Sequence, residues 1–209
     1  MKHLIIIGAG GMGRTMYDMA RESIGYGDKF DIKGYIDDNV LALSAFQNYP
    51  PMLGTIASYQ PQPDDVFICS IGGQSRRLCM ESIIQRGGEF LTMIHTTARI
   101  GTNVRIGEGT IIGAFSSIGA DACVGKYNLI QSYTVVGHDV RIGNWNRIDT
   151  HVTIVGGVII QNEVDIYTAA VLNHNVLDED NAHVAACSFV IRKVKSGTTV
   201  VGNPAKRLM

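Results

Sequence analysis

The chain has 209 residues, with 18 lysines and arginines against 19 aspartates and glutamates, so its formal net charge is −1. This balance gives no basic surface for nucleic acid or an anionic membrane. The four cysteines are scattered without a C-x-x-C pair, as in proteins with reduced thiols, and the apolar run Leu4–Ile7 is too short for a signal peptide or a membrane span. We therefore expect a soluble cytoplasmic protein with neither a nucleic-acid nor a membrane partner.

Residues 1–90 alternate between short apolar runs and helical patterns. Strands are predicted at four apolar runs, namely Leu4–Ile7, Ile32–Ile36, Val66–Cys69 and Phe90–Met93. Helices are predicted over residues 13–24, where Met16, Met19 and Ala20 follow helical spacing, and over Ser75–Arg86. Alternation of this kind predicts a small α/β domain with a parallel sheet, a Rossmann-like half domain.

A glycine-rich run, G-A-G-G-M-G, occupies residues 8–13 between the first strand and the first helix. Such a run can hold phosphate at a helix N-terminus, and it is also the fingerprint of dinucleotide-binding domains. Asp37 follows Gly13 by 24 residues, whereas that fingerprint places an acidic residue about 20 positions on. Residues 1–90 are also too short a segment for the six-stranded sheet that binds a whole dinucleotide. We expect one nucleotide here, and an NAD(P)-binding enzyme stays as an alternative.

From Ile94 onward every sixth residue is aliphatic. The series contains fourteen residues without a gap: Ile94, Ile100, Ile106, Ile112, Ile118, Val124, Ile130, Val136, Ile142, Ile148, Ile154, Ile160, Ile166 and Leu172. Asp178 interrupts the series, and Val184 and Val190 resume it in the same register. A period of six is typical of a three-sided prism in which each side points one aliphatic residue inward. Three sides make an 18-residue coil, coils stack about 4.8 Å apart, and residues 94–209 form a second domain of about six coils.

One histidine stands out on the predicted prism. His138 lies two places after an inward Val136, so it points outward near a corner, and Asp139 follows it directly. A carboxylate that holds one ring nitrogen leaves the other nitrogen to act as a base. Residue 156, one coil further on, is a glycine, which would let a substrate approach the backbone and would offer an N–H to a developing oxyanion. The three residues predict acyl transfer.

The hexads resemble those of the hexapeptide-repeat acyltransferases. Four stretches narrow the resemblance to sugar acetyltransferases of the sialic acid O-acetyltransferase and UDP-4-amino-sugar (bacillosamine pathway) N-acetyltransferase family: IIIGAGGMG, GYIDDN, VVGHDVRIG and VVGNPAKRLM. The resemblance implies a left-handed parallel β-helix, a homotrimer with active sites between subunits, and acetyl transfer from acetyl-CoA to a nucleotide-sugar used in polysaccharide or glycan synthesis.

The resemblance also implies site residues. As catalytic groups it implies the proton acceptor His138, its supporting acid Asp139 and the oxyanion donor Gly156. As acetyl-CoA contacts it implies Thr168, Ala186 and Lys206 of the closing segment. As nucleotide-sugar contacts it implies Gly10, Gly11, Met12, Asp37 and Asp38. Two positions depart from the family, because Met12 and Arg147 stand where its members usually have histidine. We expect Arg147 to contact acetyl-CoA in place of that histidine, by holding a carbonyl or a phosphate, although an arginine cannot act as a base. His151 has no counterpart in the family.

A metal is not expected. His138 and His174 are 36 residues apart, so they lie two coils or roughly 10 Å from one another, too far to share an ion. No cysteine or serine adjoins His138, so we expect direct transfer without an acyl-enzyme. A non-catalytic nucleotide-binding trimer stays as a further alternative, and the sequence leaves the acceptor sugar and N- versus O-acetylation open.

Overall fold

The computed structural model describes residues 1–208, apart from the side chain of Gln74, and divides into two compact units that meet between Leu91 and Thr92. Each unit is described by itself. Within residues 1–208, no helix combines the length and the apolar composition needed to cross a membrane.

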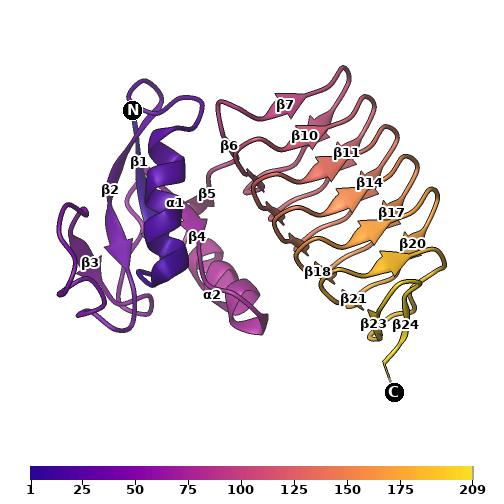
Figure 1. Cartoon of the computed structure of the whole chain (residues 1–209). Coiled ribbons are helices and arrows are strands. Elements are labelled where there is room, and N and C mark those ends of the chain that lie inside the picture. Colours follow the sequence, from indigo (N-terminus) through magenta and orange to yellow (C-terminus); the bar gives the residue numbers. More distant parts are fainter. Residues whose placement is uncertain (209) are drawn as a thin grey trace. The chain divides into compact units, whose positions relative to one another are not determined.

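Unit 1 is a parallel five-stranded sheet with two helices (Figure 1). Its strands stand in the order β3-β2-β1-β4-β5, and β1 and β4 in the middle are almost entirely buried. The elements are β1 (Lys2–Ile7), α1 (Gly11–Arg21), β2 (Phe30–Ile36), β3 (Met52–Gly54), β4 (Asp65–Cys69), α2 (Gln74–Gln85) and β5 (Glu89–Phe90). This is the Rossmann-like half domain that the alternating pattern predicts.

The strand order reverses direction between β1 and β4. In open α/β sheets, ligands bind beyond the carboxyl ends of the strands at such a switch point. Here Gly8 follows β1 with a φ of +92°, and the Ser70 hydroxyl that follows β4 donates to the carbonyls of Ile7 and Gly8 at 2.8 and 3.0 Å. A side chain at Gly13 would collide with the carbonyl oxygen of Gly8. The glycine run therefore lets α1 begin directly against the end of β1.

The main differences from the sequence prediction in unit 1 concern one helix and two strands. Helix α1 spans Gly11–Arg21 instead of residues 13–24, since Gly10 and Glu22 are its caps, and the chain then turns through Gly25 and Gly27, which both have positive φ. Strand β3 follows two prolines and was not predicted. The predicted strand Phe90–Met93 is wrong, since the Leu91 N–H bonds to Phe67 in unit 1 and the Met93 N–H bonds to Thr110 in unit 2. The run belongs to two different sheets.

Unit 2 is a left-handed parallel β-helix whose two-residue strands stack as rungs (Figure 1). We call its three sheets face 1, face 2 and face 3, in the order in which the chain visits them. Face 1 contains β6 (Met93–Ile94), β9 (Ile111–Ile112), β12 (Leu129–Ile130), β15 (Arg147–Ile148), β18 (Asp165–Ile166), β21 (His183–Val184), β23 (Thr199–Val201) and, antiparallel to it, β24 (Lys206–Arg207).

The other two faces contain only parallel strands. Face 2 contains β7 (Arg99–Ile100), β10 (Ser117–Ile118), β13 (Val135–Val136), β16 (Thr153–Ile154), β19 (Val171–Leu172) and β22 (Phe189–Val190). Face 3 contains β8 (Arg105–Ile106), β11 (Cys123–Val124), β14 (Arg141–Ile142), β17 (Ile159–Ile160) and β20 (Leu177–Asp178). Partners in neighbouring rungs are 18 residues apart, for example Val136 and Ile154. The predicted coil length is therefore confirmed.

The interior of the β-helix is a column of aliphatic side chains. From Ile112 to Leu172 every residue of the six-residue series is buried, whereas Ile100 in the first coil is 40% exposed because no coil covers it on its N-terminal side. Asp178, which breaks the series, still points inward and is completely buried. The chain thus keeps the hexad geometry through the interruption.

The corners between faces use left-handed backbone at one residue per turn. We name them corner 1–2, corner 2–3 and corner 3–1 after the faces they join. Asp139 at corner 2–3 has a φ of +59°, and Asn175 in the same column has +55°. At corner 3–1 a side-chain ladder caps backbone N–H groups: the Asn144 carbonyl accepts from Lys126, and the Asn162 carbonyl accepts from Asn144. These bonds fix the turn geometry from coil to coil.

Candidate active site

His138 and Asp139 form a hydrogen-bonded pair at corner 2–3, directly after β13. The Nδ1 atom of His138 lies 2.7 Å from Oδ2 of Asp139. Because a carboxylate oxygen accepts, Nδ1 carries the proton, and Nε2 of the neutral ring keeps a free lone pair. Both side chains are about two-thirds exposed, at 67% and 66%. The pair can therefore orient the ring while its basic nitrogen faces outward.

Gly156 lies under the His138 ring, one coil further along the same corner. A Cβ atom at this position would stand only 2.5 Å from Nε2 and 2.7 Å from Cε1 of His138. The backbone of Gly156 is therefore next to the basic nitrogen, and any side chain there would displace the ring. The structure brings together the three residues that the sequence predicts as catalytic.

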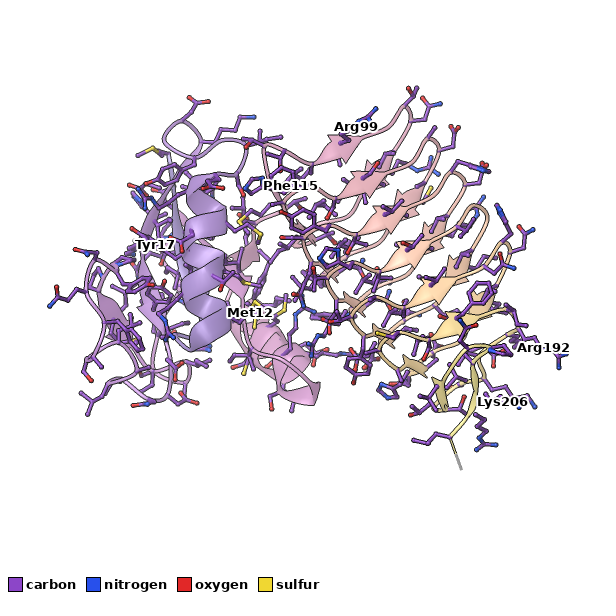
Figure 2. All side chains as sticks on the ribbon, viewed as in Figure 1. Met12, Tyr17, Arg99, Phe115, Arg192 and Lys206 are labelled. Atoms are coloured by element: carbon purple, nitrogen blue, oxygen red, sulfur yellow. The ribbon has the colours of Figure 1, made fainter. Side chains whose placement is uncertain are left out.

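The four predicted acetyl-CoA contacts lie elsewhere in the β-helix, on face 1 or at its edge. Arg147 is in β15, Thr168 and Ala186 follow β18 and β21 at corner 1–2, and Lys206 is in β24. Strands β15 and β24 are four strand spacings apart in the sheet, which corresponds to about 19 Å. Figure 2 shows Lys206 at the C-terminal end of the β-helix. A molecule that touches all four must be elongated.

Arg147 is tied to a buried acid. Its Nε and Nη2 atoms donate to the two carboxylate oxygens of Asp149 at 2.7 and 3.0 Å, and Asp149 is only 5% exposed. Burial opposes the positive charge, but the hydrogen bonds to Asp149 outweigh it and hold the pKa of Arg147 above its ordinary value. Arg147 is thus a fixed cation on face 1, without the base chemistry of a histidine.

Within one chain the predicted catalytic residues and the predicted donor contacts lie on different edges of the prism. His138 follows a strand of face 2, whereas Thr168 follows a strand of face 1. The width of face 2 separates corner 1–2 from corner 2–3. One chain alone therefore does not gather all the predicted residues at one place.

The predicted nucleotide-sugar residues lie at the N-terminus of α1 and at the end of β2 in unit 1. Gly10 caps α1 without a side-chain hydrogen bond, and a side chain at Gly10 would meet no atom within 4 Å. Gly11 and Met12 form the first turn of the helix, and Met12 is 37% exposed. The helix N-terminus thus presents backbone N–H groups beside open space.

The two aspartates at the end of β2 hold the surrounding loops. Asp37 accepts the N–H of Ala9 at 2.7 Å, so it binds the glycine run itself, and its other oxygen accepts from Asn39 at 2.8 Å. Asp38 accepts the N–H of Ile56 at 3.1 Å. The structure brings Asp37 next to the glycine run across 28 residues of sequence. In this structure both acids shape the site through the backbone.

Two features near the candidate site escaped the sequence analysis. His174 contacts the carbonyl oxygen of Gly156 through Nδ1 at 3.3 Å, although sequence reasoning considered it only as a metal ligand. His151 stacks on Tyr133, which stacks on Phe115, with ring centroids 5.0 and 5.1 Å apart. The 18-residue spacing of these residues was the signal that could have revealed both. Among residues 1–208, no three metal-ligating side chains lie close enough to hold an ion.

The fold and the two sites define a class of protein, one in which a Rossmann-like half domain precedes a left-handed hexapeptide-repeat β-helix. Residues 3–83 match the model of the PglD N-terminal domain, and residues 90–186 match that of the GMPPB C-terminal domain. No curated protein matches the sequence significantly. The chain resembles hexapeptide-repeat nucleotide-sugar acetyltransferases, as its motifs predict.

Several solved structures share this fold over the whole chain. The acetyltransferase domain of PglB from Neisseria gonorrhoeae FA1090 has a TM-score of 0.88 and 23% identity, covering 100% of both chains. PerB from Caulobacter crescentus, solved in complex with CoA and GDP-perosamine, has a TM-score of 0.86 and 23% identity over 100% of this chain and 98% of its own. WeeI from Acinetobacter baumannii AYE has a TM-score of 0.85 and 24% identity over 100% of both. At these identities the likeness is one of fold.

Proposed function

We propose that this protein is an acetyl-CoA-dependent acetyltransferase that acts on an amino or hydroxyl group of a nucleotide-activated sugar. The observation that carries the proposal is the geometry of corner 2–3, where Asp139 fixes the proton on Nδ1 of His138 and leaves Nε2 beside the backbone of Gly156. A base next to a side-chain-free backbone amide suits acyl transfer, which needs a proton acceptor and an oxyanion donor at the same carbonyl.

The proposed reaction is a direct transfer in one active site. Nε2 of His138 takes the proton from the acceptor amine or hydroxyl as that group attacks the thioester carbonyl of acetyl-CoA. The N–H of Gly156 stabilises the negative oxygen of the tetrahedral intermediate. The intermediate then collapses, the carbon–sulfur bond breaks, and the CoA thiolate recovers the proton from His138. Asp139 stabilises the imidazolium ion while it exists.

Unit 1 would bind the acceptor's nucleotide. The glycine run stands at the switch point of the sheet, and backbone N–H groups at the start of α1 suit a phosphate. The similar fold of PerB was solved with GDP-perosamine, which agrees with this assignment. We assign Gly10, Gly11 and Met12 to this subsite, with Asp37 and Asp38 as residues that shape it.

Face 1 and corner 1–2 would bind acetyl-CoA. The predicted contacts Arg147, Thr168, Ala186 and Lys206 extend along about 19 Å of the solenoid, which suits an elongated donor with phosphates at one end. Lys206 is an exposed cation at the far end of this row. The PerB and PglB acetyltransferase structures contain CoA or acetyl-CoA, which supports the same donor here.

The separation of His138 from the donor row supports a homotrimer with each active site between two chains. In the proposed trimer, corner 2–3 of one chain would lie beside corner 1–2 of the next, which would complete the site that one chain leaves divided. Face 2 also exposes apolar side chains, including Val135 at 45% and Ile191 beside β22 at 42%. An apolar face of this kind is typical of a subunit interface.

Replacement of His138 by Ala tests the proposal. We expect CoA release with an amino-sugar nucleotide to fall by about 10²- to 10⁴-fold, because general-base help is worth that much. The measurement is a thiol assay of CoA with a panel of nucleotide-activated amino and deoxy sugars.

The chain provides a matched control for this variant. His3 in β1 forms an equally short pair with Asp31, also at 2.7 Å and also partly exposed, but outside the proposed site. His3→Ala should leave the rate within about twofold of the unmodified protein. Near-normal turnover of His138→Ala would contradict the proposed mechanism.

A further inference from the structure

The backbone of Gly156 lies between two histidines in the same corner column. The ring of His138 lies over its α-carbon on one side, since a Cβ atom added at Gly156 would stand 2.5 Å from Nε2. On the other side, His174 of the next coil places Nδ1 3.3 Å from the carbonyl oxygen of Gly156. A carbonyl oxygen only accepts, so Nδ1 of His174 must be the donor.

The same carbonyl accepts a second hydrogen bond. The N–H of Asn175 lies 3.3 Å from the Gly156 oxygen, and the N–H of Gly157, in the same peptide unit, donates to the carbonyl of His138 at 3.0 Å. On the N-terminal side, the N–H of Val155 donates to Leu172 at 3.0 Å. Gly156 is therefore held at both ends, and one of the holding groups is the His174 side chain.

Two consecutive glycines at this corner need such support. Gly156 must lack a side chain because of the His138 ring, and Gly157 has a φ of +73° with the Asn175 side-chain oxygen against its α-carbon. Glycines have more backbone freedom than any other residue, so a Gly-Gly corner is the least rigid that a chain can build. At corner 3–1 the Asn144 and Asn162 side chains bind the turn backbone. At corner 2–3 His174 occupies the comparable place.

We propose that His174 is a positioning residue for the oxyanion-binding backbone. The His174 bond adds to the backbone bonds of Asn175 and Gly157 that hold the peptide unit after Gly156. It thereby narrows the torsional freedom of Gly156, and with it the range of orientations open to the Gly156 N–H in the preceding peptide unit. Catalytic hydrogen-bond donors act through preorganisation, so a donor that moves is worth less in the transition state than a fixed one. This inference rests on the proposed acetyl transfer.

The pair of variants His174→Asn and His174→Leu tests the inference. The side-chain amide nitrogen of asparagine stands at the same position along the side chain as Nδ1, so it can keep the bond to Gly156, whereas leucine has a similar shape and no donor. We expect His174→Leu to lower kcat by about 3- to 10-fold, the value of one neutral hydrogen bond, with KM for both substrates within about twofold. His174→Asn should restore most of kcat and leave the pH–rate profile unchanged.

A second readout does not depend on activity. Hydrogen–deuterium exchange of peptides covering residues 152–160 should be faster in His174→Leu than in the unmodified protein, and unchanged in His174→Asn. Equal kcat and equal exchange in all three proteins would overturn the inference, as would equal losses in both variants. If the unmodified protein transfers no acetyl group to any acceptor, the proposed function fails, and the exchange pattern alone still decides whether His174 holds the corner.

Discussion

At position 156 the missing side chain determines where the His138 imidazole can lie. The 18-residue coil length was enough to predict that Gly156 faces His138, because the register of a hexad solenoid repeats without error over many coils. The orientation of the ring could not be predicted, since it depends on the 2.7 Å bond to Asp139 and on the left-handed backbone of that residue. Their role in catalysis remains a prediction.

Other single residues were less predictable from sequence. Asp37 is predicted as a nucleotide-sugar contact, and its carboxylate also accepts the N–H of Ala9, a bond across 28 residues that follows only from the folded sheet. Arg147 is paired with Asp149, two residues on, and this pairing could have been expected because both side chains lie on the same side of face 1.

Asp178 is the most unusual residue of the interior. Its side chain is fully buried in the aliphatic column, and among the described residues neither oxygen has a hydrogen-bond partner. Burial raises the pKa of this carboxyl group from its ordinary 3.8 to about 7. Folded protein therefore keeps the proton up to near-neutral pH, whereas unfolded protein loses it near pH 4. Stability should fall as the pH rises between these values.

The variants Asp178→Asn and Asp178→Leu should both stabilise the protein, more at pH 8 than at pH 5. A displacement of about three pKa units corresponds to a penalty on the order of 4 kcal/mol at the higher pH, which neither variant suffers. Thermal unfolding at the two pH values provides the measurement. An equal gain at both values would show that the charge of Asp178 does not matter.

At the scale of elements, the sequence predicted the strands whose residues follow a regular period. The hexads predicted the strands of the three faces from β6 to β22, because each inward residue of the series marks a rung, whereas β23 and β24 lie beyond the series. Strand β3 was missed, since Met52–Gly54 has only three residues and follows two prolines. The division of Phe90–Met93 between two sheets was missed, because a continuous apolar run does not show where the chain leaves one sheet and enters the next.

The aromatic column at corner 1–2 is a stabilising element in its own right. Phe115, Tyr133 and His151 occupy equivalent positions in three successive coils, and their rings are nearly parallel, at 19° and 9°. Phe115 and Tyr133 are 56% and 50% exposed, and Figure 2 labels Phe115, the first ring of the column. Stacked pairs contribute about 0.5–1.5 kcal/mol each beyond area burial.

Removal of the central ring should cost about twice as much as removal of an end ring. Tyr133→Ala loses both stacking contacts and should lower the free energy of unfolding by about 1–3 kcal/mol, whereas Phe115→Ala loses one contact and Tyr133→Phe none. Unfolding midpoints in urea at one protein concentration give the comparison. Equal effects of Tyr133→Ala and Phe115→Ala would argue against a cooperative stack.

At the scale of the whole molecule, the chain joins a small α/β unit to a solenoid, and their order was predictable from the change of period at Ile94. The proposed site between chains was harder to predict from the sequence. A single sequence specifies the surface of one chain, and the complementary surface belongs to a second copy. Only the resemblance to known families suggested that His138 and Thr168 cooperate across an interface.

Mixing two inactive variants tests that arrangement. His138→Ala lacks the base, and Thr168→Trp blocks the proposed donor row, so neither should turn over alone. In randomly mixed trimers about one quarter of the sites would combine an intact base with an intact donor row from the next chain, and activity should return to that fraction.

The control for this mixing experiment uses the same procedure on each variant alone. No recovery in the mixture, with trimers confirmed by mass, would mean that each chain contains its own complete site.

Because the rungs of face 1 succeed one another at about 4.8 Å, the number of coils between Arg147 and Lys206 would set, in the proposed site, the reach from the acyl end of the donor to its phosphate end. The number of coils would therefore fix the distance between the two ends of the donor-binding row. An extra 18-residue coil would preserve every inward and outward position, yet move the terminal cation by one rung and mismatch a donor of fixed length. In the proposed site, the number of repeats would thus determine which length of donor fits.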